Sequence, residues 1–183
     1  MLKNKFSRRN ALSLLGASGA ATVVLVGTQT QAKAENKHKI VDAWLNAFYT
    51  AKDPDALAEF YTSDGIFEDI PGGIQIQGPD NIKCFVKTSL NLFSNFKVEL
   101  ISTFIGRNKA VAEYFLTATN TGLYPSTPSN NTFGKIFRIR TATVFDLNGN
   151  KIERSSDYYD NGGILVQLGL IDAPPLPPAP SCS

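Results

Sequence analysis

Apolar residues within positions 37–51 recur three and four places apart, which is the spacing of one face of a helix. They are Ile40, Val41, Trp44, Leu45, Phe48 and Tyr49. We therefore predict a helix over 37–51 that buries this face against another element. A short second helix is predicted next, because Asp53 can cap its first turn and Pro54 suits the first helical position. A third helix is predicted over residues 79–94.

The apolar period changes from helical spacing to strict alternation after residue 95. Four alternating segments predict four strands, at 97–106, 109–122, 133–146 and 151–160. The short links GRN and LNGN favour hairpins within the first and last pairs. Two shorter strands, GIFEDIPGG and IQIQG, precede the third helix. Because the three helices cannot bury their apolar faces alone, the pattern predicts an α+β domain with helices on one face of a curved sheet.

The two ends of the chain have compositions unlike the rest. Residues 1–34 carry the pair Arg8 and Arg9, then an apolar run rich in glycine and alanine, then Ala32-Lys33-Ala34. We interpret them as a twin-arginine export signal cleaved before Glu35, with delivery to the periplasm or an equivalent extracytoplasmic compartment. A retained anchor is the alternative, although the run is short for a membrane span and no stable membrane insertion is expected after cleavage.

Between the ends we expect one domain over residues 35–171. Residues 172–183 carry five of the ten prolines and are expected to form an extended tail. The segment 121–132 is long and polar, and we interpret it as a rim or lid.

Removal of the signal changes the charge of the protein. The whole chain has 18 basic and 16 acidic residues, but residues 1–34 hold five of the basic residues and no acid. The remaining chain has a net charge of about −3. No basic region is left to bind a phosphate backbone, so a nucleic-acid partner is not expected.

Several kinds of chemistry lack their usual residues. His38 is the one histidine, and Cys84 and Cys182 are the two cysteines. We therefore expect no metal site and no nucleophilic set of the Ser-His or Cys-His kind. No glycine-rich phosphate loop is present, so no nucleotide cofactor is expected. Whether Cys84 and Cys182 form a disulfide stays open.

The motifs occur in an order that resembles the SnoaL-like polyketide cyclases, a branch of the nuclear transport factor 2-like superfamily. They are the helix with the lone Trp44, then KDPDALAEFYTSDGIFEDIPGG, GPDNI, and KIERSSDYYDNGGILVQLG. The resemblance covers about residues 37–170. It implies a cone-shaped, curved antiparallel or mixed sheet with three N-terminal helices, as in a cystatin-like α+β barrel, and no cofactor. The superfamily includes isomerases, dehydratases, hydrolases and binding modules, so the fold alone does not decide the function.

The resemblance also implies candidate catalytic residues. Asp157 and Asp160 lie three positions apart, so a regular strand points them to opposite faces. By similarity to the RDYFD-like context of limonene epoxide hydrolases, Asp157 faces the cavity, while Asp160 faces away or caps the next helix. By similarity to VEDPVG of ketosteroid isomerase, IFED supplies a second cavity acid, Asp69. Two carboxylates in an apolar pocket should raise the pKa of at least one of them.

The predicted ligand is a small apolar molecule, and its expected contacts are Trp44, Phe67, Tyr114, Leu116, Asn120 and Tyr159. Some of these residues depart from the relatives. Tyr114 and Leu116 stand where epoxide hydrolases have arginine and aspartate, and Asn120 stands where many cyclases have histidine. The oxyanion donors of ketosteroid isomerase are also missing.

Both acids also have a purely structural alternative. Asp69 could accept from a backbone amide near the IPGG turn, and Asp157 could pair with Arg138 or Arg140.

Two functional hypotheses follow. The first is a cofactor-independent cyclase or isomerase that uses Asp157 and Asp69 for proton transfer. The second is a noncatalytic binding protein for a lipid, a pigment or a polyketide-like molecule. A homodimer through the outer sheet face is also predicted, on the apolar residues Ile101, Ile105, Phe115 and Ile136.

Overall fold

The N-terminal helix spans residues 35–45 and continues into a π-helical turn, η1 (Asn46–Thr50), which confirms the first predicted helix. The computed structural model describes residues 35–124 and 131–174. The other helices are α2 (Pro54–Ala58), α3 (Pro79–Leu92) and α4 (Asn161–Gln167). The carboxylate of Asp53 caps α2 by accepting from the backbone N–H of Ala56 at 3.0 Å. Asp160 caps α4 in the same way, through Gly163 at 2.7 Å.

Six strands form one mixed sheet in the order β2-β1-β6-β5-β4-β3. Neighbouring strands are antiparallel except for β1 and β6, which pair in parallel. Their bounds are β1 (Tyr61–Asp69), β2 (Ile74–Gln77), β3 (Phe93–Ile105), β4 (Lys109–Asn120), β5 (Ile136–Asn148) and β6 (Lys151–Tyr159). The α+β architecture with a curved mixed sheet is therefore confirmed.

Two strands begin earlier than the alternation predicts. β1 starts at Tyr61 rather than at residue 65, and β3 starts at Phe93, directly after α3. In β3 the pairing with β4 shifts between Ser94 and Lys97, and Asn95 has a positive φ of 51°. Such a shift interrupts the alternation of side chains, so the sequence pattern becomes regular only beyond it.

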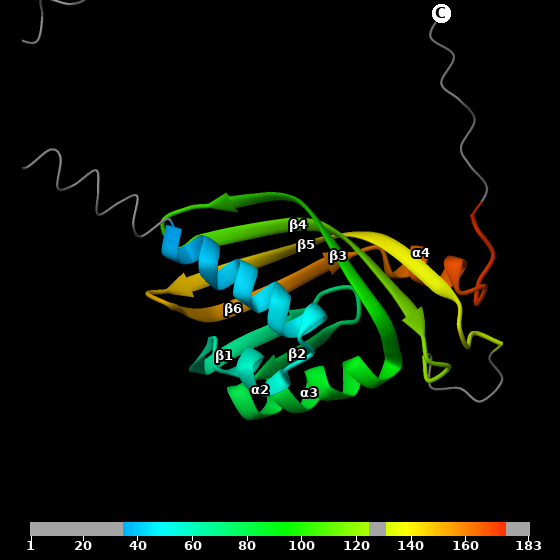
Figure 1. Cartoon of the computed structure of the whole chain (residues 1–183), viewed down its shortest axis with the longest axis horizontal. Coiled ribbons are helices and arrows are strands. Elements are labelled where there is room, and N and C mark those ends of the chain that lie inside the picture. Colours follow the sequence, from blue (N-terminus) through cyan, green and yellow to red (C-terminus); the bar gives the residue numbers. More distant parts are fainter. Residues whose placement is uncertain (1–34, 125–130, 175–183) are drawn as a thin grey trace, which may run out of the picture.

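The core lies between one face of the sheet and the helices. Figure 1 shows the N-terminal helix crossing the strongly curved sheet, with α2 and α3 beside it. The predicted apolar face of this helix is buried, and Trp44 and Val41 have no exposed surface. Trp44 packs edge-on against Phe145 of β5, with ring centroids 5.2 Å apart. The helix therefore closes the concave side of the sheet.

The last strand contains a bulge that simple alternation misses. Asp146 pairs with Arg154, but the next residue, Leu147, pairs with Ile152, so Glu153 is the extra residue. Ile152 is fully buried, whereas Glu153 is exposed and accepts from the Asn148 amide at 2.8 Å. Strict alternation along residues 151–160 predicts that Glu153 shares a face with Asp157. This is wrong, because the bulge changes which residues face inward. Beyond it, Asp157 is buried as predicted, and so is Ser155.

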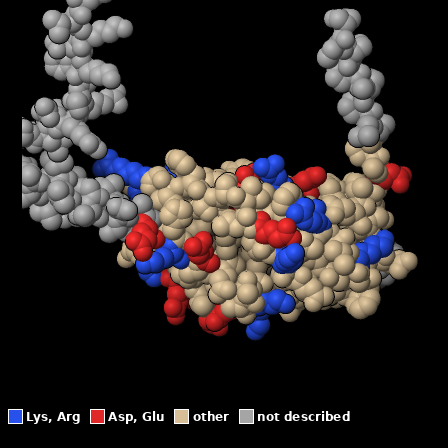
Figure 2. Space-filling model, turned by 45° about the horizontal axis from the view of Figure 1, so that its top comes forward, with Lys and Arg blue, Asp and Glu red and all other residues tan. Residues whose placement is uncertain are grey.

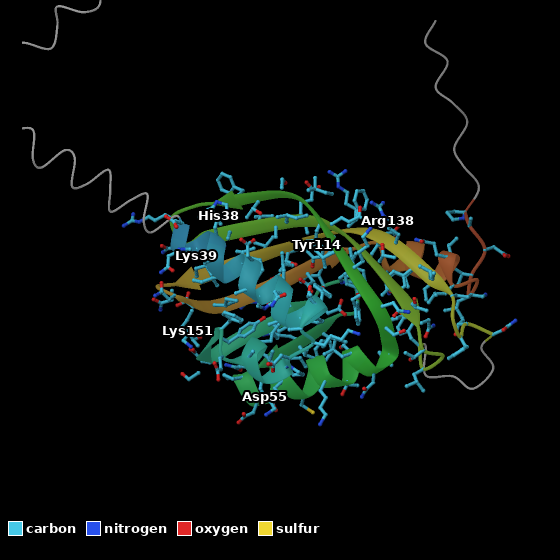
Figure 3. All side chains as sticks on the ribbon, viewed as in Figure 1. His38, Lys39, Asp55, Tyr114, Arg138 and Lys151 are labelled. Carbon is cyan, nitrogen blue, oxygen red and sulfur yellow. The ribbon has the colours of Figure 1, made fainter. Side chains whose placement is uncertain are left out.

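The arginines of β5 lie on the outer face and do not pair with Asp157. The Arg138 guanidinium pairs with Glu99 at 3.2 Å, and Arg140 pairs with Glu113. Figure 3 shows Arg138 at the edge of the molecule and Tyr114 in its interior. Positive and negative side chains are interspersed over the face shown in Figure 2.

Several sequence predictions fall on residues outside the described ranges. They include the signal segment 1–34, most of the tail, Cys182, and residues 125–130 of the predicted rim, so the domain boundaries stay predictions. Cys84 of α3 is exposed. None of the described helices is long and apolar enough to cross a membrane.

Candidate functional site

A cavity of about 210 Å³ lies between the sheet and the helices. Half of its 18 lining residues are aromatic: Phe48, Tyr49, Phe67, Phe85, Phe93, Phe96, Tyr124, Phe137 and Tyr159. The acids in the lining are Asp69 and Asp157, and no lysine, arginine or histidine of the described residues lines it. The cavity is therefore an apolar space with two carboxylates and no basic partner.

Asp157 reaches this cavity from β6 and is only 6% exposed. Burial, with a smaller contribution from the nearby charge of Asp69, raises the pKa of its carboxyl to about 7. A hydrogen bond from the Thr143 hydroxyl to Asp157 Oδ1, 2.7 Å long, acts in the opposite direction. The carboxyl can therefore both accept and donate a proton near neutral pH.

A line of buried hydroxyls leads to Asp157. Because Thr143 gives its single proton to Asp157, it accepts from the Tyr114 hydroxyl, which is 2.9 Å away. Tyr114 in turn accepts from the Tyr49 hydroxyl at 3.2 Å. Burial raises the pKa of both tyrosines, so they stay protonated donors. This line of hydroxyls positions the Asp157 carboxyl through Thr143.

Asp69 lies beside Asp157, because the two residues are paired across the parallel strands β1 and β6. The Tyr159 hydroxyl contacts both Asp69 oxygens, at 2.9 and 3.0 Å, and the Gly72 N–H donates to Asp69 Oδ1 at 3.0 Å. The expected bond to a backbone amide near the IPGG turn is thus present. Burial, with Asp69 adding its negative charge, raises the pKa of Tyr159, so Tyr159 remains a donor to Asp69.

A family model for the SnoaL-like polyketide cyclases matches residues 39–168. The chain belongs to this family. No curated protein matches it. The family assignment agrees with the order of motifs in the sequence.

Solved structures with the same fold are similar to this SnoaL-like chain at low identity. A ketosteroid isomerase-like protein from Catenulispora acidiphila is 23% identical, with a TM-score of 0.62, over 74% of this chain and 97% of its own. A SnoaL-like protein from Jannaschia is 16% identical, with a TM-score of 0.66, over 78% and 96%. A polyketide cyclase-like protein from Xanthomonas campestris is 19% identical, with a TM-score of 0.65, over 74% and 98%. These similarities confirm the nuclear transport factor 2-like fold.

The structure separates the predicted ligand contacts of the SnoaL-like chain into two groups. Phe67, Leu116 and Tyr159 line the cavity, together with both predicted acids. Trp44, Tyr114 and Asn120 do not line it. The Trp44 ring donates to the Tyr61 hydroxyl at 3.0 Å within the core.

Asn120 has a local structural role instead. Its amide donates to the Tyr124 carbonyl at 2.6 Å, and its Oδ1 accepts from Gly122 N–H at 2.8 Å. Asn120 therefore shapes the segment that places Tyr124 at the cavity.

The sequence does not single out three polar residues near Asp157. It places Tyr49 only on a helix face, and Thr141 and Thr143 are two of several buried positions on β5. The register pairs Thr143 with Asp157, and this pairing identifies its role. Thr141 lines the cavity, and its buried hydroxyl has no hydrogen-bond partner. Among the described residues, no group of three metal-binding side chains lies together.

Replacement of Thr143 by valine should raise the pKa of Asp157 above its value of about 7, because the hydrogen bond that favours the carboxylate is lost. Carbon-detected NMR titration of the Asp157 carboxyl measures this change. Thr141→Val is the matched control, since the same substitution two residues away removes no bond to Asp157. An unchanged pKa in Thr143→Val, or an equal rise in the control, would show that Thr143 does not tune this carboxyl.

Proposed function

We propose that this SnoaL-like chain binds a small, largely apolar molecule in its cavity and that Asp157 exchanges a proton with it without a cofactor. The observation that carries the proposal is the buried Asp157 carboxyl, whose pKa of about 7 suits an acid or base near neutral pH. The reaction class would be that of a cyclase or isomerase.

Asp69 supports this role without itself being the main proton acceptor. Its two oxygens are engaged by Tyr159 and Gly72, whereas Asp157 has only the bond from Thr143 among the described residues. The charge of Asp69 helps to keep the Asp157 pKa high. We therefore assign proton transfer to Asp157 and electrostatic tuning to Asp69.

A noncatalytic binding role is the second candidate. The observation in its favour is that Asp69 is not a free partner for Asp157 in proton transfer, because the Asp69 carboxylate already accepts a hydrogen bond from the Tyr159 hydroxyl. Small-molecule binding has a precedent in the fold, since the Catenulispora acidiphila protein was solved in complex with trimethylamine. Mass spectrometry of an organic extract from protein purified from its native host would identify a retained ligand.

Asp157→Asn should slow proton exchange by about 10²–10⁴-fold, because asparagine cannot act as an acid or a base. The measurement is deuterium uptake by the recovered ligand in heavy water, followed by mass spectrometry. Asp64→Asn serves as the control, because Asp64 is an exposed carboxylate on β1 outside this cavity. If the wild-type protein catalyses no exchange, the binding role stands; if Asp157→Asn exchanges as fast as wild type, Asp157 is not the acid or base.

We also propose that residues 1–34 direct twin-arginine export and are then removed. The motif Ser7-Arg8-Arg9 and the small residues Ala32 and Ala34 support this. The mass of the mature protein tests the proposal, since cleavage predicts Glu35 at its N-terminus.

Pairing of two copies through the outer sheet face stays a proposal as well. Of the four apolar residues predicted to make this contact, Ile101 and Ile136 are exposed.

A further inference from the structure

The charge in the cavity lacks a counter-ion. Its lining includes Asp69 and Asp157, while none of the described lysine, arginine or histidine side chains lines it. The arginines of the adjacent strand pair with Glu99 and Glu113 on the outer face. A negatively charged ligand would therefore meet two acids and no compensating cation.

One carboxylate oxygen is available to a ligand. Both oxygens of Asp69 accept from Tyr159, and one also accepts from Gly72. Asp157 uses Oδ1 for Thr143, and its Oδ2 has no hydrogen-bond partner among the described residues. Because Asp157 is more than nine-tenths buried, this oxygen can accept a hydrogen bond only from a group inside the cavity.

The walls suit a cation as well as an apolar group. Neighbouring rings pack together, with Phe67 and Phe85 at 5.3 Å and Tyr49 and Phe96 at 5.8 Å between centroids. The faces of such rings attract ammonium groups. One lining ring makes such a contact within the protein, because the Lys52 ammonium lies over Phe96, 5.4 Å from the ring centroid.

We infer that this cavity recognises an organic ammonium ion with apolar substituents, held with its cationic end against Asp157. The inference rests on the proposed function in that it needs the cavity to bind a small molecule, but it does not need catalysis. The volume of about 210 Å³ is below the roughly 300–1,000 Å³ of pockets for drug-sized ligands, so the ion is small.

Binding of such an ion should depend on pH. The titratable groups that face Asp157 are Asp69 and Tyr61 from β1, Tyr49 from η1, Tyr114 from β4, and Tyr159 from its own strand. Burial keeps the four tyrosines neutral, so Asp157 is the group that changes near pH 7. Since the cation favours the carboxylate, affinity should fall by up to ~100-fold between about pH 8 and about pH 5.

Calorimetric titration with 3,3-dimethylbutylammonium tests the inference, because its N–H groups can donate to Asp157 Oδ2. Its uncharged isostere 3,3-dimethylbutan-1-ol and the anion 3,3-dimethylbutanoate keep the apolar group and change the charge. At about pH 8 we expect the ammonium ion to bind at least ~10-fold more tightly than the alcohol, and the anion to bind more weakly than both. The preference for the ammonium ion should be lost in Asp157→Asn and kept in Asp64→Asn.

The outcomes separate this inference from the proposed function. Equal or tighter binding of the alcohol, no binding of 3,3-dimethylbutylammonium in the millimolar range, or an undiminished preference in Asp157→Asn would overturn the ammonium inference. A neutral native ligand that undergoes exchange would also overturn it while leaving the proposed function intact. A preference for the ammonium ion in a protein that catalyses no exchange would leave the inference standing and remove the catalytic role.

Discussion

Asp157→Asn should stabilise the protein more at about pH 8 than at about pH 4, and the difference should reach about 4 kcal/mol. The reason is the pKa of the Asp157 carboxyl, which burial raises from 3.8 to about 7 in the folded protein. Below about pH 4 both folded and unfolded chains carry the proton. As pH rises toward 7, the unfolded chain releases it first, so the wild type loses stability over this window.

The measurement is the free energy of unfolding in urea at several pH values for both proteins. The difference in unfolding free energy between variant and wild type removes the contributions of the other titrating groups. Any pH-independent cost of the asparagine side chain adds equally to this difference at every pH. Asp64→Asn, at an exposed position, is the matched control, since it makes the same chemical change without removing a buried carboxyl. A flat difference for Asp157→Asn would mean that its carboxyl titrates as in the unfolded chain.

Trp44→Ala should destabilise the protein by about 3–5 kcal/mol, because it leaves a cavity in the core. Trp44 has no exposed surface, and its ring packs on Phe48 at 5.4 Å and on Phe145 at 5.2 Å. Trp44→Phe should cost less, because the new ring still fills part of the space, and the Tyr61 hydroxyl keeps its 2.6 Å contact with Ser155.

Thermal or urea unfolding of the ligand-free protein measures these changes. Phe104→Ala is a suitable control, since Phe104 is 68% exposed and its loss should change stability by less than about 0.5 kcal/mol. If Trp44→Ala unfolds like wild type but loses the ligand, Trp44 contributes to binding rather than to the core.

Local sequence patterns predict much of the fold. The helix over 37–51 has a regular apolar stripe, and the capping residues Asp53 and Asp160 act where expected. The strands β4 and β5 alternate cleanly because each has a neighbour on both sides and buries one face. These elements depend mainly on nearby residues, so the chain reveals them directly.

The details of the site depend on contacts between distant residues. The resemblance to related sequences predicts that Asp157 faces inward, but the bulge at Glu153 becomes visible only through its pairing with β5. Likewise Tyr114 alternates correctly into the interior. The sequence does not show, however, that Tyr49, whose hydroxyl contacts the Tyr114 hydroxyl, lines the cavity while Tyr114 does not. Alternation predicts which side of the sheet a residue faces. Whether its side chain reaches the cavity depends on how the helices pack on that side.

The parallel pairing of β1 with β6 has a consequence for the order of folding. Tyr159 and Asp69, which bond directly, are 90 positions apart, so the chain must close a long loop before these residues meet. During synthesis β1 emerges early and has only β2 as a neighbour until the final strand is made. We therefore expect the pocket acids to come together only after β6 is made, and a chain truncated before β6 to expose a strand edge prone to association.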